Sequence, residues 1–321
     1  MTPTRSHTPV REVVVTGVGL ALPGVPTYAD LLGPVPGEGG FDPEAGLRGR
    51  EMRHKDRASR LALRAVEFAF QDAGLTVGDA AFLGPADATA VVVSTNLGNV
   101  DSVCESTDTI ATSGVMGLSP LGLPQTSSNV VAGWVAIRHA LRGPNLTVCN
   151  GATSGLDAMS WARNLIAAGR AEAAVVVGVE PANEVVTKLL GEQTIDVAVA
   201  IVLEPSMAAT ARGARPRAAL GGYARAEDLP TALTAAGVTE ETSVGLWLGD
   251  GHGAKPAGLL DGTPQIALES RLGPLSGALG VLQCAAAAAH LERSATGSVL
   301  ATAGGPGHDA AAALLLTPVG A

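Results

Sequence analysis

One short stretch of the chain has the form that often carries a catalytic nucleophile. Residues 147–159 read TVCNGATSGLDAM, an apolar strand end followed by a sharp turn and then by a helical pattern. A nucleophile on such a turn would carry out covalent acyl-transfer or hydrolytic chemistry. The turn itself holds Gly151, Ala152 and Thr153, and the nearest cysteine, Cys149, lies just before it.

Two residues are alternatives for this chemistry. Cys149 is on the strand rather than on the turn, where a buried cysteine is most often a small apolar side chain. His252, in the segment GDGHG, could act as a general base, but no cysteine partner accompanies it. The three cysteines form no CxxC pair and no histidine spacing fits a metal site, so we expect no metal. The glycine-rich segments lack the pattern of a dinucleotide site, so we expect no cofactor.

The composition excludes several classes of function. The chain has 321 residues and a formal net charge of −9, whereas a nucleic-acid binder needs a basic face. No apolar run reaches the length of a membrane-spanning helix, so we expect a soluble cytoplasmic protein without a membrane partner. Aromatic residues make up only 3% of the chain, so the core must consist of small aliphatic side chains, as closely packed α/β layers allow.

The apolar segments form two successive α/β halves, which we expect at residues 1–205 and 206–321. Strands are predicted in the first half at 12–21, 88–96, 145–150, 171–180 and 195–205, with helices at 56–75, 127–143 and 154–169. The second half has predicted strands near 218–223, 243–248, 265–268, 298–302 and 310–316, with helices near 229–236 and 277–293. The strands lack clean alternation, which is typical of sheets covered on both faces.

Six segments resemble, in this order, the ketosynthases of the thiolase-fold superfamily over nearly the whole chain. They are VVVTGVG, DRASRLALRAVEFAFQDAGL, NVVAGWVAIRHALRGPNLTV, GATSGLDAM, ESRLGPLSGALG and GGPGHDAAAALLL. The resemblance implies a five-layered α-β-α-β-α fold of two similar halves and an obligate dimer. It also implies a site in which a cysteine at a helix N-terminus takes the acyl chain as a thioester, assisted by two histidines.

The catalytic residues of that family are missing at all three matching positions. Ala152 stands at the position of the cysteine, and Pro274 at that of the second histidine, with Glu269 where the family has lysine. Asp250 falls at the position of the first histidine, or Gly251 does in a second register. The chain therefore resembles the non-catalytic chain length factor, the ketosynthase β-subunit of type II polyketide synthases, although that subunit usually carries glutamine at the position of Ala152.

This resemblance implies partners and a role. The chain would pair with an active ketosynthase subunit and help to form the acyl tunnel for a polyketide or polyene chain carried by an acyl carrier protein. It would thereby set the length of the chain. The residues that would line the tunnel, or else pack in an ordinary core, are Met116, Leu118, Leu121 and Leu123. The strand that contains Val148 is expected at the dimer interface.

Two other functions stay open on the sequence. The chain could be a divergent thiolase-fold acyltransferase or hydrolase that acts on its own through Cys149, Ser154 or His252. It could also be a homodimeric binding scaffold, which would form a stable dimer when expressed alone.

Overall fold

The computed structural model describes residues 11–34, 37, 39–77, 81–249, 251, 259–294 and 296–320. Ten strands form one sheet in the order β10-β9-β11-β12-β8-β1-β7-β6-β4-β5. The sheet has two five-stranded parts, which meet where β1 pairs with β8 through two residue pairs, at Val14 and Val15. The strands of the first part are β1 (Val13–Ala21), β4 (Thr89–Ser94), β5 (Asn145–Val148), β6 (Ala173–Glu180) and β7 (Val197–Pro205). Those of the second are β8 (Ala218–Ala226), β9 (Val244–Gly249), β10 (Gln265–Ala267), β11 (Ser298–Gly304) and β12 (Ala311–Thr317).

Both parts of the sheet have the same topology. In each, the strands lie in the order 3-2-4-5-1 when numbered along the chain. The second strand is parallel to its two neighbours, β4 to β5 and β6, and β9 to β10 and β11. The fourth and fifth strands are antiparallel in both parts. This repetition confirms the prediction of two similar halves.

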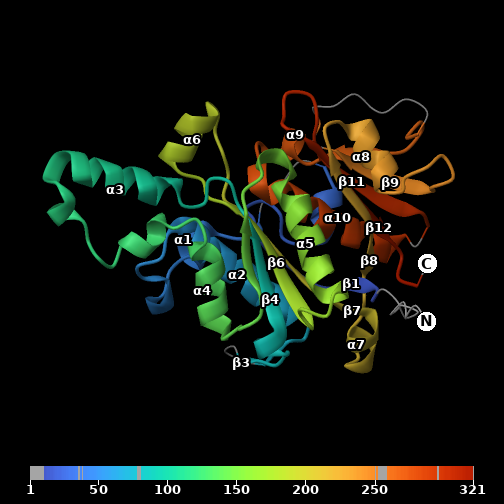
Figure 1. Cartoon of the computed structure of the whole chain (residues 1–321), viewed down its shortest axis with the longest axis horizontal. Helices are drawn as coiled ribbons and strands as arrows, with labels where there is room; N and C mark the ends of the chain where they lie inside the picture. The colour runs from blue at the N-terminus through green and yellow to red at the C-terminus, as the bar shows by residue number, and fades with distance from the viewer. Residues whose placement is uncertain are drawn as a thin grey trace, which may run out of the picture.

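Three apolar clusters produce five layers, α-β-α-β-α (Figure 1). The helices α2 (Arg57–Asp72) and α4 (Val130–His139) cover the outer face of the first part. Helix α8 (Leu229–Ala235) covers the outer face of the second. The helices α5 (Ser154–Ala167) and α10 (Leu279–Arg293) lie in the central cluster, which takes side chains from both parts of the sheet. The predicted thiolase-like fold is therefore confirmed.

The remaining elements are short or peripheral, and several were not predicted. Helix α3 (Val100–Ser113) projects from the body of the protein (Figure 1). The sequence analysis missed α3 because its many Ser and Thr residues hide a weak apolar stripe. The others are α1 (Pro43–Gly46), α6 (Glu184–Leu190), α7 (Ser206–Ala211), α9 (Glu269–Leu272) and the hairpin of β2 (Thr76–Val77) and β3 (Ala81–Phe82).

The two central helices touch backbone to backbone. Gly155 is the second residue of α5 and Gly280 the second of α10. A Cβ atom on Gly280 would lie 2.4 Å from the backbone nitrogen of Leu156, and one on Gly155 would lie 2.6 Å from that of Gly280. Neither helix can therefore carry a side chain at this crossing. The buried run Ala285–Ala289 continues the close contact of α10 with its surroundings.

We predict that Gly280→Ala destabilises the fold by roughly 1–3 kcal/mol, because the added methyl group meets backbone that cannot move aside. The measurement is the free energy of unfolding in urea. Gly133→Ala in α4 is the matched control, since nothing lies within 4 Å of a Cβ at that position. There the gain in helix propensity should stabilise the protein by up to about 1 kcal/mol. Equal effects of the two changes would contradict the close crossing.

Candidate functional site

Ala152 lies at the N-terminus of a buried helix, on a turn that is firmly held. The turn is η6 (Gly151–Thr153), which leads directly into α5. Gly151 has a φ of +67°, which glycine adopts without strain. Asn96, which follows β4, donates from Nδ2 to the Gly151 carbonyl at 3.0 Å and accepts from the Ser154 hydroxyl at 3.0 Å. The geometry would suit a nucleophile, but the side chain of Ala152 is a methyl group, which has no nucleophilic chemistry.

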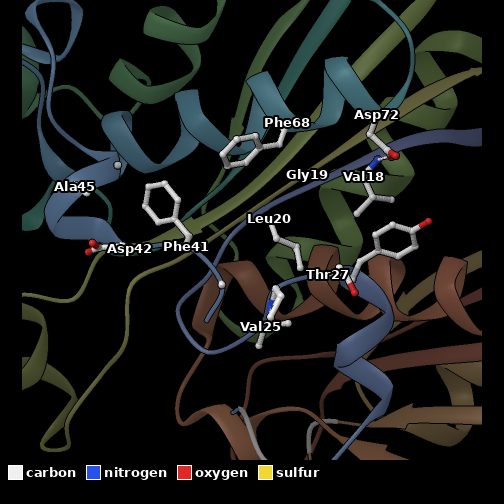
Figure 2. A pocket seen from close by; sticks show the side chains of 14 residues that line it. Val18, Gly19, Leu20, Val25, Thr27, Phe41, Asp42, Ala45, Phe68 and Asp72 are labelled. Carbon is white, nitrogen blue, oxygen red and sulfur yellow. Dashed lines mark hydrogen bonds between the residues drawn. The ribbon is translucent and has the colours of Figure 1, made fainter. Parts of the chain in front are cut away.

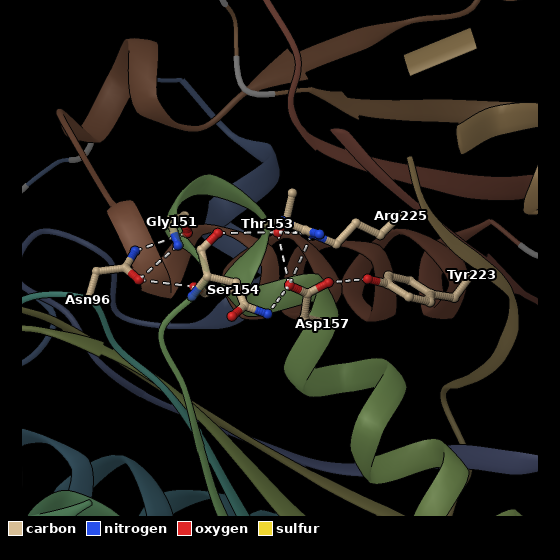
Figure 3. Close-up of polar contacts among 8 residues, drawn as sticks. Asn96, Gly151, Thr153, Ser154, Asp157, Tyr223 and Arg225 are labelled. Atoms are coloured by element: carbon tan, nitrogen blue, oxygen red, sulfur yellow. Dashed lines mark hydrogen bonds and ion pairs between the residues drawn. The ribbon is translucent and has the colours of Figure 1, made fainter. Parts of the chain in front are cut away.

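Asp157, one turn further along α5, is the centre of a buried polar network (Figure 3). It accepts hydrogen bonds from Asn150 Nδ2 at 2.8 Å, from Thr153 Oγ1 at 2.9 Å and from the Tyr223 hydroxyl. Arg225 Nε lies 3.9 Å from the same carboxylate. Burial, together with Asp157, raises the pKa of Tyr223, so this hydroxyl stays protonated as a donor. The network joins α5 to β8 of the second half and leaves Asp157 no role as a free base.

A second turn, η7 (Ser276–Ala278), lies against η6 and leads directly into α10. Asn96 links the two turns, because its Nδ2 also donates to Ser276 Oγ at 3.0 Å. Pro274 is half-buried, two residues before η7. The structure therefore brings the segments of Ala152 and Pro274 together, as the sequence comparison of their motifs implied. A proline side chain offers neither a hydrogen-bond donor nor a base.

The structure describes only one of the other two positions at which the family residue is replaced, Glu269 and Asp250. Glu269 begins α9, and its Oε1 accepts the backbone N–H of Leu275 at 2.8 Å, so this carboxylate supports the loop around Pro274. Asp250 and His252 lie outside the described residues.

Glu180, at the end of β6, is a buried carboxylate that the sequence analysis did not single out. Glu180 is only 4% exposed. Oε1 accepts the backbone N–H groups of Asn96 at 2.7 Å and Gly277 at 3.0 Å. Oε2 accepts the N–H of Leu97 at 3.0 Å and the Thr95 hydroxyl at 3.2 Å. Burial raises the pKa of Glu180 to about 7, although these hydrogen bonds favour the charged form.

Cys149 is poorly suited to be the alternative nucleophile. Its Sγ donates to the Thr95 carbonyl at 2.8 Å, so the thiol proton is engaged. Cys149 follows the end of β5 and is exposed, so the expectation of a buried cysteine on the strand is wrong. Partial burial of the thiol and the nearby Glu180 carboxylate still raise its pKa. Both effects reduce the fraction of thiolate, which is the reactive form.

The four predicted tunnel residues lie on a projecting arm, which we define as residues 99–127. The arm consists of α3 and the turns η4 (Val115–Gly117) and η5 (Leu123–Thr126). Met116 is 95% exposed, Leu121 and Leu123 are also exposed, and Leu118 is half-buried. The alternative prediction, that these residues pack in the core of this chain, is therefore wrong for Met116, Leu121 and Leu123. Within this chain, Leu121 lines a surface pocket with His54 and Arg57, and Leu118 and Leu123 line a second pocket with residues of α3.

The strand β5, predicted at the interface, is the open edge of the first half. Within the described part of the chain, β5 pairs with β4 alone. Val148 itself is 6% exposed and packs in the central core, so its side chain does not face a partner. A charge at Val148 would damage this chain's own fold, and the residue is therefore a poor probe of the interface.

The two helices that pack against β5 carry exposed apolar side chains. Helices α4 and α5 pack against this strand, and they cover opposite faces of the sheet. Trp161 of α5 is 51% exposed and Ile137 of α4 is 71% exposed. Trp161 shares one face of its helix with Leu165, four residues on, which packs in the same cluster as Leu146 of β5. Sequence periodicity missed both residues because each belongs to a helix that is otherwise well buried.

The pocket in Figure 2 lies away from these turns. It has a volume of about 680 Å³ and lies between β1, α2 and the turn η1 (Tyr28–Leu32). Its walls include Leu20, Phe41 and Phe68, and Asp72 closes one end by accepting the Val18 N–H at 2.7 Å. None of the predicted site residues lines this pocket.

Among the described residues, no group of three or more His, Cys, Asp or Glu side chains could hold a metal ion. None of the helices in that part of the chain is long and apolar enough to span a bilayer.

Comparison with known proteins identifies relatives of the chain. Residues 26–198, more than half of it, match the family described as Beta-ketoacyl synthase, N-terminal domain. The chain is 28% identical over 143 residues to 3-oxoacyl-[acyl-carrier-protein] synthase 2 of Coxiella burnetii, covering 44% of this chain and 34% of that protein. It is 29% identical to the granaticin polyketide putative beta-ketoacyl synthase 1 of Streptomyces violaceoruber, over 67% of this chain and 63% of that protein. The match thus spans about a third of the first of these relatives.

Two solved structures share the fold. One is described as the ishigamide ketosynthase/chain length factor, with a TM-score of 0.78 and 20% identity. The other is AntDE:AntF, a type II PKS acyl-carrier protein in complex with its ketosynthase bound to the hexaketide, with a TM-score of 0.78 and 18% identity. Each match covers 97% of this chain and all of the other.

We predict that Glu180 makes the protein less stable as the pH rises. The pKa of Glu180 is about 7 in the folded protein against 4.5 for an ordinary glutamate, so the folded state binds the proton more tightly. This contribution to stability is present at low pH and is lost as the pH rises from about 5 to about 7. The difference in unfolding free energy between wild type and Glu180→Gln should change by roughly 2–3 kcal/mol over that range.

Urea unfolding of both proteins at several pH values between about 5 and 8 measures this difference. His139 has its pKa lowered to about 4 by burial, so it contributes a slope of opposite sign. That slope is common to both proteins and cancels in the comparison. Identical pH profiles for the two proteins would rule out Glu180 as the titrating group.

Proposed function

Because the chain belongs to the β-ketoacyl synthase family, we propose that it is a non-catalytic ketosynthase subunit of the chain length factor type. The observation that carries the proposal is the methyl group of Ala152 on the turn before α5. A helix N-terminus can stabilise a thiolate, but a methyl group cannot form a thioester. Pro274, two residues before the neighbouring turn η7, has no proton donor in its side chain. The condensing chemistry must therefore come from another chain.

The open edge of β5 supports a partner that continues the sheet. An exposed strand edge presents unpaired backbone N–H and C=O groups, which proteins normally cover. Trp161 and Ile137 are exposed on the two helices that pack against this strand, and aromatic side chains are the usual anchors of protein interfaces. We infer that the equivalent strand of an active ketosynthase subunit pairs with β5 and that these side chains pack against it.

The arm supports the same assignment. Every residue of α3, a helix that lies wholly within the described residues, is at least partly exposed. A 14-residue helix gains little stability by itself in water, so packing against a partner would stabilise it. In a heterodimer, Met116, Leu118, Leu121 and Leu123 would line the acyl tunnel and limit chain length. The growing polyketide or polyene chain would arrive on an acyl carrier protein.

The relatives are consistent with this role. The two solved structures that share the fold are described as a ketosynthase/chain length factor and as a type II PKS ketosynthase in complex with its acyl-carrier protein. The granaticin relative is described as a β-ketoacyl synthase, and such enzymes need the nucleophile that Ala152 lacks.

We predict that the chain alone forms no β-ketoacyl product from acyl and malonyl carrier protein. Ala152→Cys alone should not restore condensation, since Pro274 still lacks the proton donor and base of a histidine. Product mass after incubation measures the outcome, with an intact ketosynthase subunit from the same source, assayed together with this chain, as the positive control. Condensed product from the wild-type chain alone would refute the proposal.

We predict that Trp161→Arg abolishes co-purification with the ketosynthase subunit. Loss of a central aromatic anchor typically costs an interface 2 kcal/mol or more, or roughly thirtyfold in affinity. The lone variant should keep its stability, because the side chain is half exposed in the wild type. Met207→Arg is the control, since Met207 is an exposed apolar residue in α7, on another part of the surface. A complex that survives Trp161→Arg would show that the interface lies elsewhere.

A further inference from the structure

The buried carboxylate of Glu180 joins segments that are far apart in the sequence. Its two carboxylate oxygens accept hydrogen bonds from the loop Thr95–Leu97 on one side and from Gly277 of η7 on the other. The loop lies between the end of β4 and the start of α3, so it is the root of the arm. Glu180 itself belongs to the central strand β6, which is buried along its whole length. One side chain therefore attaches the root of the arm to the most rigid part of the fold.

The arm has other attachments besides Glu180: Asn96 bonds to Gly151, Ser154 and Ser276, and α3 contacts α6. Asn99 Nδ2 donates to the Thr126 carbonyl at 3.0 Å, which closes the two ends of the arm on each other. Trp134 Nε1 donates to Gln125 Oε1 at 3.5 Å, and Gln125 Nε2 donates to the His54 carbonyl. These two hydrogen bonds fix the C-terminal end of the arm. At the outgoing end, Glu180 accepts from three consecutive residues, Thr95 to Leu97. This carboxylate is therefore one of the contacts that set the direction in which α3 leaves the body, and the one that binds three consecutive residues of its root.

The other side of the contact is a strained turn. Ser276 has a φ of +45°, a left-handed conformation that a non-glycine residue adopts at a cost of roughly 1–3 kcal/mol. The hydrogen bonds from Asn96 to Ser276 and from Gly277 to Glu180 hold it there. A Cβ atom on Gly277 would lie 2.7 Å from Glu180 Oε1, so only glycine allows the carboxylate this close.

We propose that Glu180 is a positioning residue that latches the root of the arm to η7 and thereby sets how the arm is presented to the partner subunit. The latch is a property of the lone chain, and only its effect on the partner rests on the proposed function. A glutamine at this position has the same shape but no charge, and its Oε1 can still accept the N–H groups of Gly277 and Asn96. The glutamine NH2 group, which replaces Oε2, is a hydrogen-bond donor and cannot accept. The Thr95 hydroxyl can reverse its role and accept, but the Leu97 N–H loses its partner.

The same argument applies to protonation of Glu180, whose pKa of about 7 lies within reach of physiological pH. The protonated side chain stays buried, so this loosening is local and distinct from the global stability described above. The charge of Glu180 also acts on a neighbouring titratable group, since it helps to raise the pKa of the Cys149 thiol. The acidic residues in the first turns of α3, α5 and α9 are Asp101, Asp157 and Glu269, and Asp196 is ion-paired with Arg57.

Hydrogen–deuterium exchange on the lone full-length chain tests the latch. In Glu180→Gln, amides of residues 97–113 should exchange about tenfold faster, the loss expected for one charge-assisted backbone hydrogen bond. Strand β6 and helix α10 should keep their protection. The control is Glu172→Gln, which changes an exposed glutamate just before the same strand. Unchanged protection of the arm in a folded Glu180→Gln protein would overturn the proposal.

A pH series on the wild type gives a second readout that does not require the variant to fold. After correction for intrinsic exchange rates, protection of residues 97–113 should fall as the pH is lowered through about 7, and it should be pH-independent in Glu180→Gln. Wild-type protection that does not change with pH would overturn the release of the latch by protonation of Glu180. If the latch is present but neither protein binds a ketosynthase subunit, the proposed function fails and the latch stands.

Discussion

The contact between Gly155 and Gly280 is the constraint on which the rest of the structure depends. Each glycine is the second residue of its helix, so the two helices cross near their N-termini. The turns η6 and η7 immediately precede these helices, and the crossing therefore places the turns side by side. The same contact fixes a thin central layer between the two parts of the sheet. A chain built from alanine, valine and glycine, with few aromatic residues, can fill so narrow a space.

The polar groups around these turns form an ordered network although the side chain of Ala152 between them is only a methyl group. Asn96 bonds to both turns, Asp157 is satisfied by three neighbours, and Glu180 accepts from two loops. Each buried polar atom would destabilise the fold if its partner were lost. The scaffold of the site is therefore part of the stability of the protein. The geometry of the turn before α5 is therefore maintained by these polar contacts and does not depend on the side chain at Ala152.

The sequence predicted the parts of the fold that local pattern determines. The buried runs of β1, β6 and β7 and the periodic helices α2, α5 and α10 all carry strong apolar signals. Helix α3 was missed because nothing in this chain buries it. Glu180 was missed because its partners are 83 to 97 residues away, and no local pattern marks such contacts. Val148 was predicted in the right strand, but periodicity in an apolar strand does not tell which side chains face a partner.

The repeated topology has a consequence for how the protein is made. Helix α5 and the inner face of the first part of the sheet are buried against elements that follow Ser206 in the chain. While residues 206–321 are still being synthesised, that face has no cover. At typical rates of about 5–20 residues per second, this interval lasts roughly 6–20 s. During it, the nascent first half exposes this apolar surface, which the second half covers once it emerges from the ribosome, whereas the edge of β5 stays open among the described residues of the complete chain.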